Sequence, residues 1–193
     1  LATAVKNQGQ TGTCWSFSTT SLLESQLLKN NNSNINLSEM FTVRNIYLDK
    51  ATNYVMRQGA AQFGEGGLGH NVIEAIAKYG SMPEEAYSGL LPTQQEYNHS
   101  KLMNELKIYL DSLLKHKPLM PHWQKGVAQI LDKYMGAAPD KFNFEGKEYT
   151  AKNFAVEVLK FNASDYVNLT SFTHKPFYEP FIIDIPDNFS NGS

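Results

Sequence analysis

A single cysteine, Cys14, is the feature that most constrains this 193-residue chain. It follows a turn marked by Gly9 and Gly12, and it opens a segment ending near Lys29 whose leucines recur at helical spacing. A cysteine at a helix N-terminus meets free backbone N–H groups and the positive end of the helix dipole, which favour the thiolate over the thiol. Since the thiolate is the nucleophile, the position predicts a catalytic cysteine. The alternative is a buried cysteine that packs as a small hydrophobic residue.

Gln8 lies six residues before the cysteine, where its side-chain amide could donate a hydrogen bond to a developing oxyanion. Together, Gln8, Gly12, Cys14 and Trp15 resemble the active-site segment of papain-like cysteine peptidases. The stretch GTCWSFS is most similar to the bleomycin hydrolase and aminopeptidase C branch, which lacks the disulfide that papain forms at the position of Thr11. The resemblance implies that Cys14 is the nucleophile and that Gln8 helps to hold the oxyanion.

A second motif has three glycines among the four residues 64–67, and it precedes a predicted helix from His70 to Tyr79. Glycine permits positive φ angles and lets another backbone come close. In papain-like peptidases, a Gly-Gly at this point pairs with an extended substrate, as in strand addition. The resemblance therefore implies that Gly66, Gly67 and Trp15 contact a peptide substrate. A glycine turn before a helix, with no further role, is the alternative.

A cysteine nucleophile needs a base and an orienting residue, usually His and then Asn or Asp. Papain-type spacing places them about 130–150 residues after the cysteine, and this chain has no histidine there. His174, followed by Asn188, is the nearest alternative, but Pro176 is incompatible with a central strand. His70 is expected at a helix N-cap or on the surface, and the other histidines are expected to be solvated: His99, His116 and His122.

The histidine and asparagine are therefore expected in a C-terminal remainder of a longer enzyme, so that residues 1–193 alone would be inactive. The expected fold is α+β and papain-like, with inserted helices in the helical domain and an incomplete sheet-rich domain. We divide the chain into a papain-like core segment (1–97), a mostly helical insertion (98–162) and the start of the sheet-rich domain (163–193).

Local patterns predict further elements along the chain. A helix capped by Ser38 should end near Gly59, and apolar spacing predicts two more helices, at 102–114 and 123–134. The remaining predictions are a hairpin at 141–149, a short helix from a Thr150 cap to Phe161, and a strand at 181–185.

Composition excludes several classes of function. Hydrophobic residues make up 41% of the chain, which is enough for a folded core, and a net charge of −2 argues against nucleic acid or a membrane as an obligatory partner. One cysteine and scattered histidines show no ligand spacing, so no metal or other cofactor is expected. The family default is a cytoplasmic enzyme, with an exported form and a homo-oligomer left open. Two rival functions remain: a binding or scaffold protein with a relic peptidase site, and an acyltransferase on the same scaffold.

Overall fold

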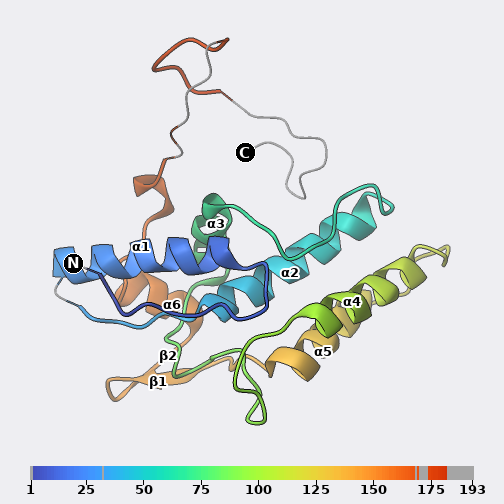
Figure 1. The fold of residues 1–193 in the computed structure, drawn as a ribbon, viewed down its shortest axis with the longest axis horizontal. Helices are drawn as coiled ribbons and strands as arrows, with labels where there is room; N and C mark the ends of the chain where they lie inside the picture. The colour runs from blue at the N-terminus through green and yellow to red at the C-terminus, as the bar shows by residue number, and fades with distance from the viewer. Residues whose placement is uncertain (1, 32, 168, 170–173, 182–193) are drawn as a thin grey trace.

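The computed structural model describes residues 2–31, 33–167, 169 and 174–181, and every structural statement below concerns these residues. Three helices pack against one another: α1 (Cys14–Asn31), α2 (Glu39–Met56) and α3 (Gly69–Tyr79). Figure 1 shows α1 at the left and α2 running away from it to the right. The core between them is apolar and includes Val43, Tyr47 and Val72, each 0% exposed.

Local signals fix the ends of these helices. The hydroxyl of Ser38 accepts a hydrogen bond from the Phe41 N–H at 3.0 Å, which confirms the predicted N-cap of α2. Helix α2 ends at Met56, three residues before Gly59, because the chain turns at Arg57 and enters the left-handed region at Gln58. Gly80 ends α3 with a φ of 85°, and a Cβ there would lie 2.2 Å from the backbone of Ala151. Only glycine fits that position.

Helices α4 (Ser100–Leu113) and α5 (Trp123–Met135) form a pair that packs on α2. They lie side by side at the lower right of Figure 1. One face of α4 is fully buried, and its leucines at positions 102, 106, 110 and 113 are each 0% exposed. This stripe at helical spacing is the one that predicted the helix. The assignment of residues 98–162 as an insertion stays a prediction.

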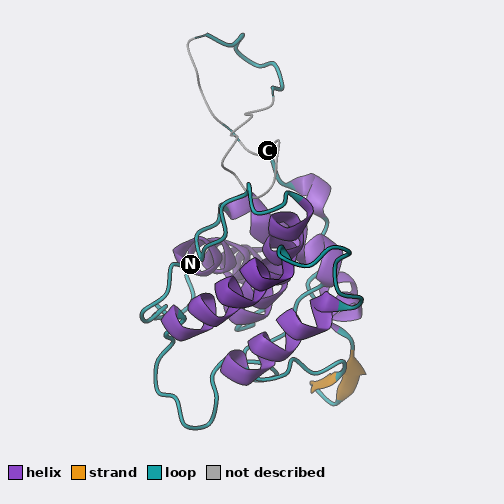
Figure 2. Cartoon of the chain, turned by 90° about the vertical axis from the view of Figure 1, so that its right-hand side faces the viewer, coloured by secondary structure: helices purple, strands orange, loops and turns teal. Residues whose placement is uncertain are grey.

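The predicted hairpin is confirmed as β1 (Phe142–Phe144) and β2 (Lys147–Tyr149), which pair antiparallel. It lies at one edge of the helical body (Figure 2). Glu145 and Gly146 connect the strands with φ angles of 49° and 81°, as a two-residue hairpin turn requires. Rings from both strands pack edge-on against Phe154, with centroids 5.1 to 5.9 Å apart.

Helix α6 (Ala151–Glu157) begins at the predicted Thr150 cap, whose hydroxyl accepts from the Asn153 N–H at 3.2 Å. The helix ends before Phe161, against the prediction, because Lys160 takes a φ of 51° that breaks helical geometry. A 3₁₀ turn, η1 (Ala163–Asp165), follows. The predicted strand at 181–185 lies outside the described residues except for its first residue. No helix in the described part of the chain has the length and apolar character needed to cross a membrane.

A buried charged cluster attaches the N-terminal segment to α1 and α2. The Lys6 Nζ lies 2.8 Å from Glu24 Oε1 and 2.6 Å from Glu39 Oε1, and it donates to the Leu37 carbonyl at 3.1 Å. Both carboxylates are at most 2% exposed. The Thr3 hydroxyl also donates to Glu24, at 2.7 Å. The extended segment that leads to Cys14 is therefore held against the middle of α1 and the start of α2.

Candidate active site

Cys14 is the first residue of α1 and is exposed to solvent. The helix starts because the Thr13 carbonyl accepts hydrogen bonds from the N–H groups of Ser16 and Phe17, at 2.9 and 3.3 Å. The Ser16 hydroxyl donates to the Glu39 carbonyl at 3.0 Å, which fixes the first turn of α1 on α2. The predicted position of Cys14 at a helix N-terminus is confirmed, and its role as the nucleophile stays a prediction.

The turn before the helix, which we call the nucleophile turn (residues 8–13), is rigidly held. Gly9 has a φ of 60°, and a Cβ there would lie 2.5 Å from the Tyr97 carbonyl, to which Gln10 donates at 2.8 Å. The Thr11 hydroxyl donates to the Gln8 carbonyl at 2.8 Å and lies 2.5 Å from the buried Thr13 hydroxyl. Two threonine hydroxyls thus close the turn.

The Gln8 side chain lies within this turn. Its Nε2 donates to the Thr11 carbonyl at 2.6 Å. A primary amide carries two N–H donors, so this bond uses one and leaves the other for a second acceptor. The contact also holds the amide in one orientation, which is what a preorganised oxyanion donor needs. Its role toward an oxyanion stays a prediction.

The residues Gly64, Glu65, Gly66 and Gly67, which we call the glycine segment, lie against the nucleophile turn. The Trp15 indole Nε1 donates to the Glu65 carbonyl at 3.0 Å. A Cβ at Gly67 would lie 2.7 Å from the Trp15 ring, so this contact requires glycine. Gly66 is exposed, with no atom within 4 Å of the position a Cβ would take. Trp15 itself is 5% exposed. The structure therefore assigns Trp15 to holding the segment, and substrate contact by these residues stays a prediction.

Two charged residues that sequence reasoning missed hold the glycine segment. A Glu65 carboxylate oxygen accepts from the Gly12 N–H at 2.6 Å. The Lys50 Nζ, on α2, donates to the Gly64 carbonyl at 2.7 Å and to the Gly66 carbonyl. Burial lowers the pKa of Lys50 to about 8, although the Glu65 charge acts in the opposite direction. In the sequence, the one feature that could have pointed to this contact is an acidic residue, Glu65, placed between two glycines.

The histidines occupy different parts of the structure. The expectation that His99 is solvated is wrong: it is 3% exposed, and its Nδ1 lies 3.1 Å from the buried Tyr47 hydroxyl. Burial lowers its pKa to about 4. His70 is half-buried in the first turn of α3, and His116 and His122 are exposed as expected. His174 is exposed in the segment 174–181, which lies away from the helices in both views (Figures 1 and 2). The identity of the base stays a prediction, and Asn188 lies outside the described residues.

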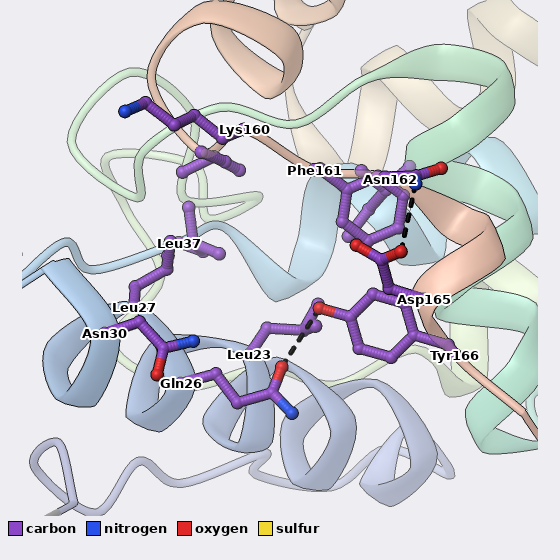
Figure 3. Close-up of a pocket in the computed structure, with 12 residues that line it drawn as sticks. Leu23, Gln26, Leu27, Asn30, Leu37, Lys160, Phe161, Asn162, Asp165 and Tyr166 are labelled. Carbon is purple, nitrogen blue, oxygen red and sulfur yellow. Dashed lines mark hydrogen bonds between the residues drawn. The ribbon is translucent and has the colours of Figure 1, made fainter.

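A separate cavity of about 240 Å³ lies beside the C-terminal half of α1 (Figure 3). Its apolar floor includes Leu23 and Leu27, and the Tyr166 hydroxyl closes one side by donating to Gln26 Oε1 at 3.0 Å. Cys14 is not among its lining residues. The cavity thus lies apart from the nucleophile, although both belong to α1.

Comparison with known proteins identifies related chains. The profile of the family described as "Papain family cysteine protease" matches residues 1–109. The viral cathepsin of Autographa californica nuclear polyhedrosis virus is 39% identical over 84 residues, which are 44% of this chain and 22% of that protein. Cysteine proteinase 1 of Dictyostelium discoideum is 35% identical over 103 residues, which are 52% of this chain and 29% of that protein.

A solved structure is also similar to this chain. The crystal structure of PepW from Lactobacillus rhamnosis superposes with a TM-score of 0.61 at 19% identity, over 84% of this chain and 45% of PepW. At that identity the likeness concerns the fold alone. The chain thus spans less than a third of each of the two curated relatives and less than half of PepW.

Proposed function

Because the chain belongs to the papain family of cysteine proteases, whose profile matches residues 1–109, we propose that the full-length protein containing it is a cysteine peptidase, specifically an aminopeptidase. The observation that carries the proposal is the exposed Cys14 at the start of α1, next to an oriented Gln8 amide. The aminopeptidase assignment is supported by the stretch GTCWSFS, which resembles the bleomycin hydrolase and aminopeptidase C branch.

In the proposed reaction the Cys14 thiolate attacks the scissile carbonyl carbon, and the electron pair of the carbonyl moves to its oxygen. The second N–H of Gln8 and the backbone N–H of Cys14 donate to this oxyanion. Collapse forms a thioester and expels the amine, which takes a proton from an imidazolium. Water then hydrolyses the thioester and regenerates the thiolate. A C-terminal remainder of the same enzyme supplies the histidine and the asparagine that orients it.

The peptide would lie along the exposed Gly66, with its backbone extended. Trp15 and Lys50 donate hydrogen bonds to carbonyls of the glycine segment, which holds the segment, and with it the exposed Gly66, in one conformation. Backbone pairing of this kind binds a peptide without selecting its sequence, and pockets for side chains select it.

The aminopeptidase proposal predicts a requirement for an unblocked amino terminus. The full-length protein should hydrolyse a short peptide with a free terminal amine at least tenfold faster than the same peptide after N-acetylation. Initial rates measured by chromatography of the products test this, with N-acetylation as the matched control. Equal rates on the two peptides would contradict an aminopeptidase while leaving a peptidase in place. Transfer of the acyl group to an added amine, without hydrolysis, would instead support an acyltransferase.

Gln8→Ala is expected to lower turnover by roughly 10²–10³, the usual cost of removing one oxyanion-hole donor. The rate at which iodoacetamide alkylates Cys14 should stay within about twofold, because that reaction develops no oxyanion. Steady-state hydrolysis and alkylation rates, measured on the same preparation, separate the two effects. If alkylation falls together with turnover, then Gln8 acts by holding the nucleophile turn through Thr11, and the oxyanion role is wrong.

A further inference from the structure

We propose that Glu65 is a positioning residue, which latches the glycine segment onto the nucleophile turn and so sets the geometry between Cys14 and a bound peptide. Lys50 completes the latch by donating to the carbonyls of Gly64 and Gly66. The inference rests on the proposed function, since it assigns Glu65 and Lys50 to the same site. Lys50 lies outside the motifs that suggested the family in this sequence, and Glu65 lies within one of them only as the residue between its glycines.

Glu65 makes two contacts on opposite sides of the nucleophile. Its carboxylate accepts from the Gly12 N–H at 2.6 Å, and its backbone carbonyl accepts from the Trp15 indole at 3.0 Å. Gly12 and Trp15 flank Cys14 in the sequence, two residues before it and one after it. A single residue therefore fixes the segment to both sides of the nucleophile. The carboxylate contact is a charge-assisted hydrogen bond, which is about twice as strong as a neutral one.

The contact between the two loops is close enough to constrain their sequences. A Cβ at Gly12 would lie 3.0 Å from the Glu65 Cβ, and one at Gly67 would lie 2.7 Å from the Trp15 ring. Glycine at each position lets the two backbones approach. With glycine at three of its four positions, the segment has high conformational freedom when unattached, and fixing one residue costs about 1–2 kcal/mol of backbone entropy. Polar contacts must offset that cost.

Lys50 supplies the other half of the latch. It lies on α2, its residue is 2% exposed, and its Nζ donates to the carbonyls of Gly64 and Gly66. These two carbonyls flank Glu65 in the sequence. The ammonium of Lys50 and the carboxylate of Glu65 therefore both restrain the same four residues. The negative charge of Glu65 favours the charged form of Lys50 and opposes the effect of burial. The segment is thus held by two charged side chains: the Glu65 carboxylate bonds to the nucleophile turn, and the Lys50 ammonium bonds to the segment's own carbonyls.

A non-covalent latch is the arrangement that this composition allows. Cys14 is the only cysteine in the chain, so no disulfide within these 193 residues can join the nucleophile turn to the glycine segment. Hydrogen bonds and packing carry the whole contact. Loss of Glu65 should therefore loosen the segment while leaving the thiol and the helix that carries it unchanged.

The test compares Glu65→Ala and Glu65→Gln with Glu85→Ala, an exposed acidic residue that serves as the matched control. In the full-length protein, amide hydrogen exchange at Gly12, whose N–H donates to the Glu65 carboxylate, should be roughly tenfold faster in Glu65→Ala, as expected for loss of a hydrogen bond to a charged group. The glutamine variant, which keeps an acceptor oxygen but not the charge, should fall between Glu65→Ala and the wild type. The control should match the wild type.

A second readout connects the latch to the site. Alkylation of Cys14 by a peptidyl chloromethyl ketone, in which the sulfur displaces chloride, should be at least tenfold slower in Glu65→Ala, and KM for a peptide should rise more than kcat falls. Alkylation by iodoacetamide should change less than twofold. Unchanged exchange in Glu65→Ala would overturn the latch, and so would an equal loss with both reagents. Absence of peptide hydrolysis in the wild type would overturn the proposed function, but the exchange result would still decide the latch.

Discussion

Replacing Cys14 by alanine is expected to abolish peptide hydrolysis by the full-length protein and to leave its fold intact. Removing the nucleophile from a linked catalytic group typically costs several orders of magnitude in turnover, about 10⁵-fold or more. The fold should tolerate the change because the residue is exposed at the first position of α1, where losing the sulfur opens no cavity in the core. Alanine is also the best helix former.

Two measurements check this expectation. Turnover is followed on a peptide that the wild type hydrolyses, and thermal unfolding is followed by circular dichroism, where Tm should shift by no more than about 2 °C for an exposed substitution. Cys14→Ser is the matched control, since it keeps the shape of the side chain but is a much weaker nucleophile. Wild-type turnover in the alanine variant would contradict the assignment of Cys14, as would a serine variant as active as the wild type.

Features encoded by neighbouring residues could be predicted from the sequence. Ser38 caps α2, Gly80 ends α3, and Glu145-Gly146 turns the hairpin, because each depends on the conformational preferences of one or two residues. The start of α1 at Cys14 was predicted from its position before a helical pattern. The papain-like α+β fold is likewise confirmed, by the family match over residues 1–109 and by the likeness to PepW.

Contacts between residues far apart in the sequence could not be predicted in this way. The Gly12 N–H and the Glu65 carboxylate are 53 positions apart, and no periodicity links them. His99 follows a polar stretch and was expected to be solvated, but the Tyr47 hydroxyl on α2 provides the buried partner that makes its burial favourable. The hydrogen bond from the Trp15 indole to the Glu65 carbonyl, 50 positions away, is a second contact of this kind.

Lys6→Met is expected to cause the largest loss of stability, about 3–5 kcal/mol in the free energy of unfolding, because it leaves buried carboxylates without their cation. Hydrogen bonds with Glu24 and Glu39 raise the pKa of Lys6 although burial acts to lower it. Burial raises the pKa of Glu39 and brings that of Glu84 to about 7. The Lys6 ammonium therefore pairs directly with two carboxylates and acts on Glu84 through its charge, so its removal leaves an excess of negative charge among these groups.

The loss should depend on pH. A carboxyl group whose pKa is raised by folding contributes stability that is complete below its unfolded pKa, and this stability is lost as pH rises through the folded pKa. For Glu84 that interval runs from 4.5 to about 7. Without the Lys6 charge, which lowers the pKa of Glu84, the penalty at high pH grows. Lys6→Met should therefore cost more at pH 8 than at pH 5, where Glu84 is largely protonated.

Urea denaturation of the full-length protein at the two pH values measures this difference. Lys125→Met is the matched control, because Lys125 is exposed on α5, and its effect should stay within about 0.5 kcal/mol at both pH values. Adding Glu84→Gln to Lys6→Met removes one of the competing carboxyl groups, so the double variant should recover part of the stability at pH 8 and little at pH 5. A loss of equal size at both pH values, or no recovery in the double variant, would mean that Lys6 stabilises the fold by packing its aliphatic stem and not by its charge.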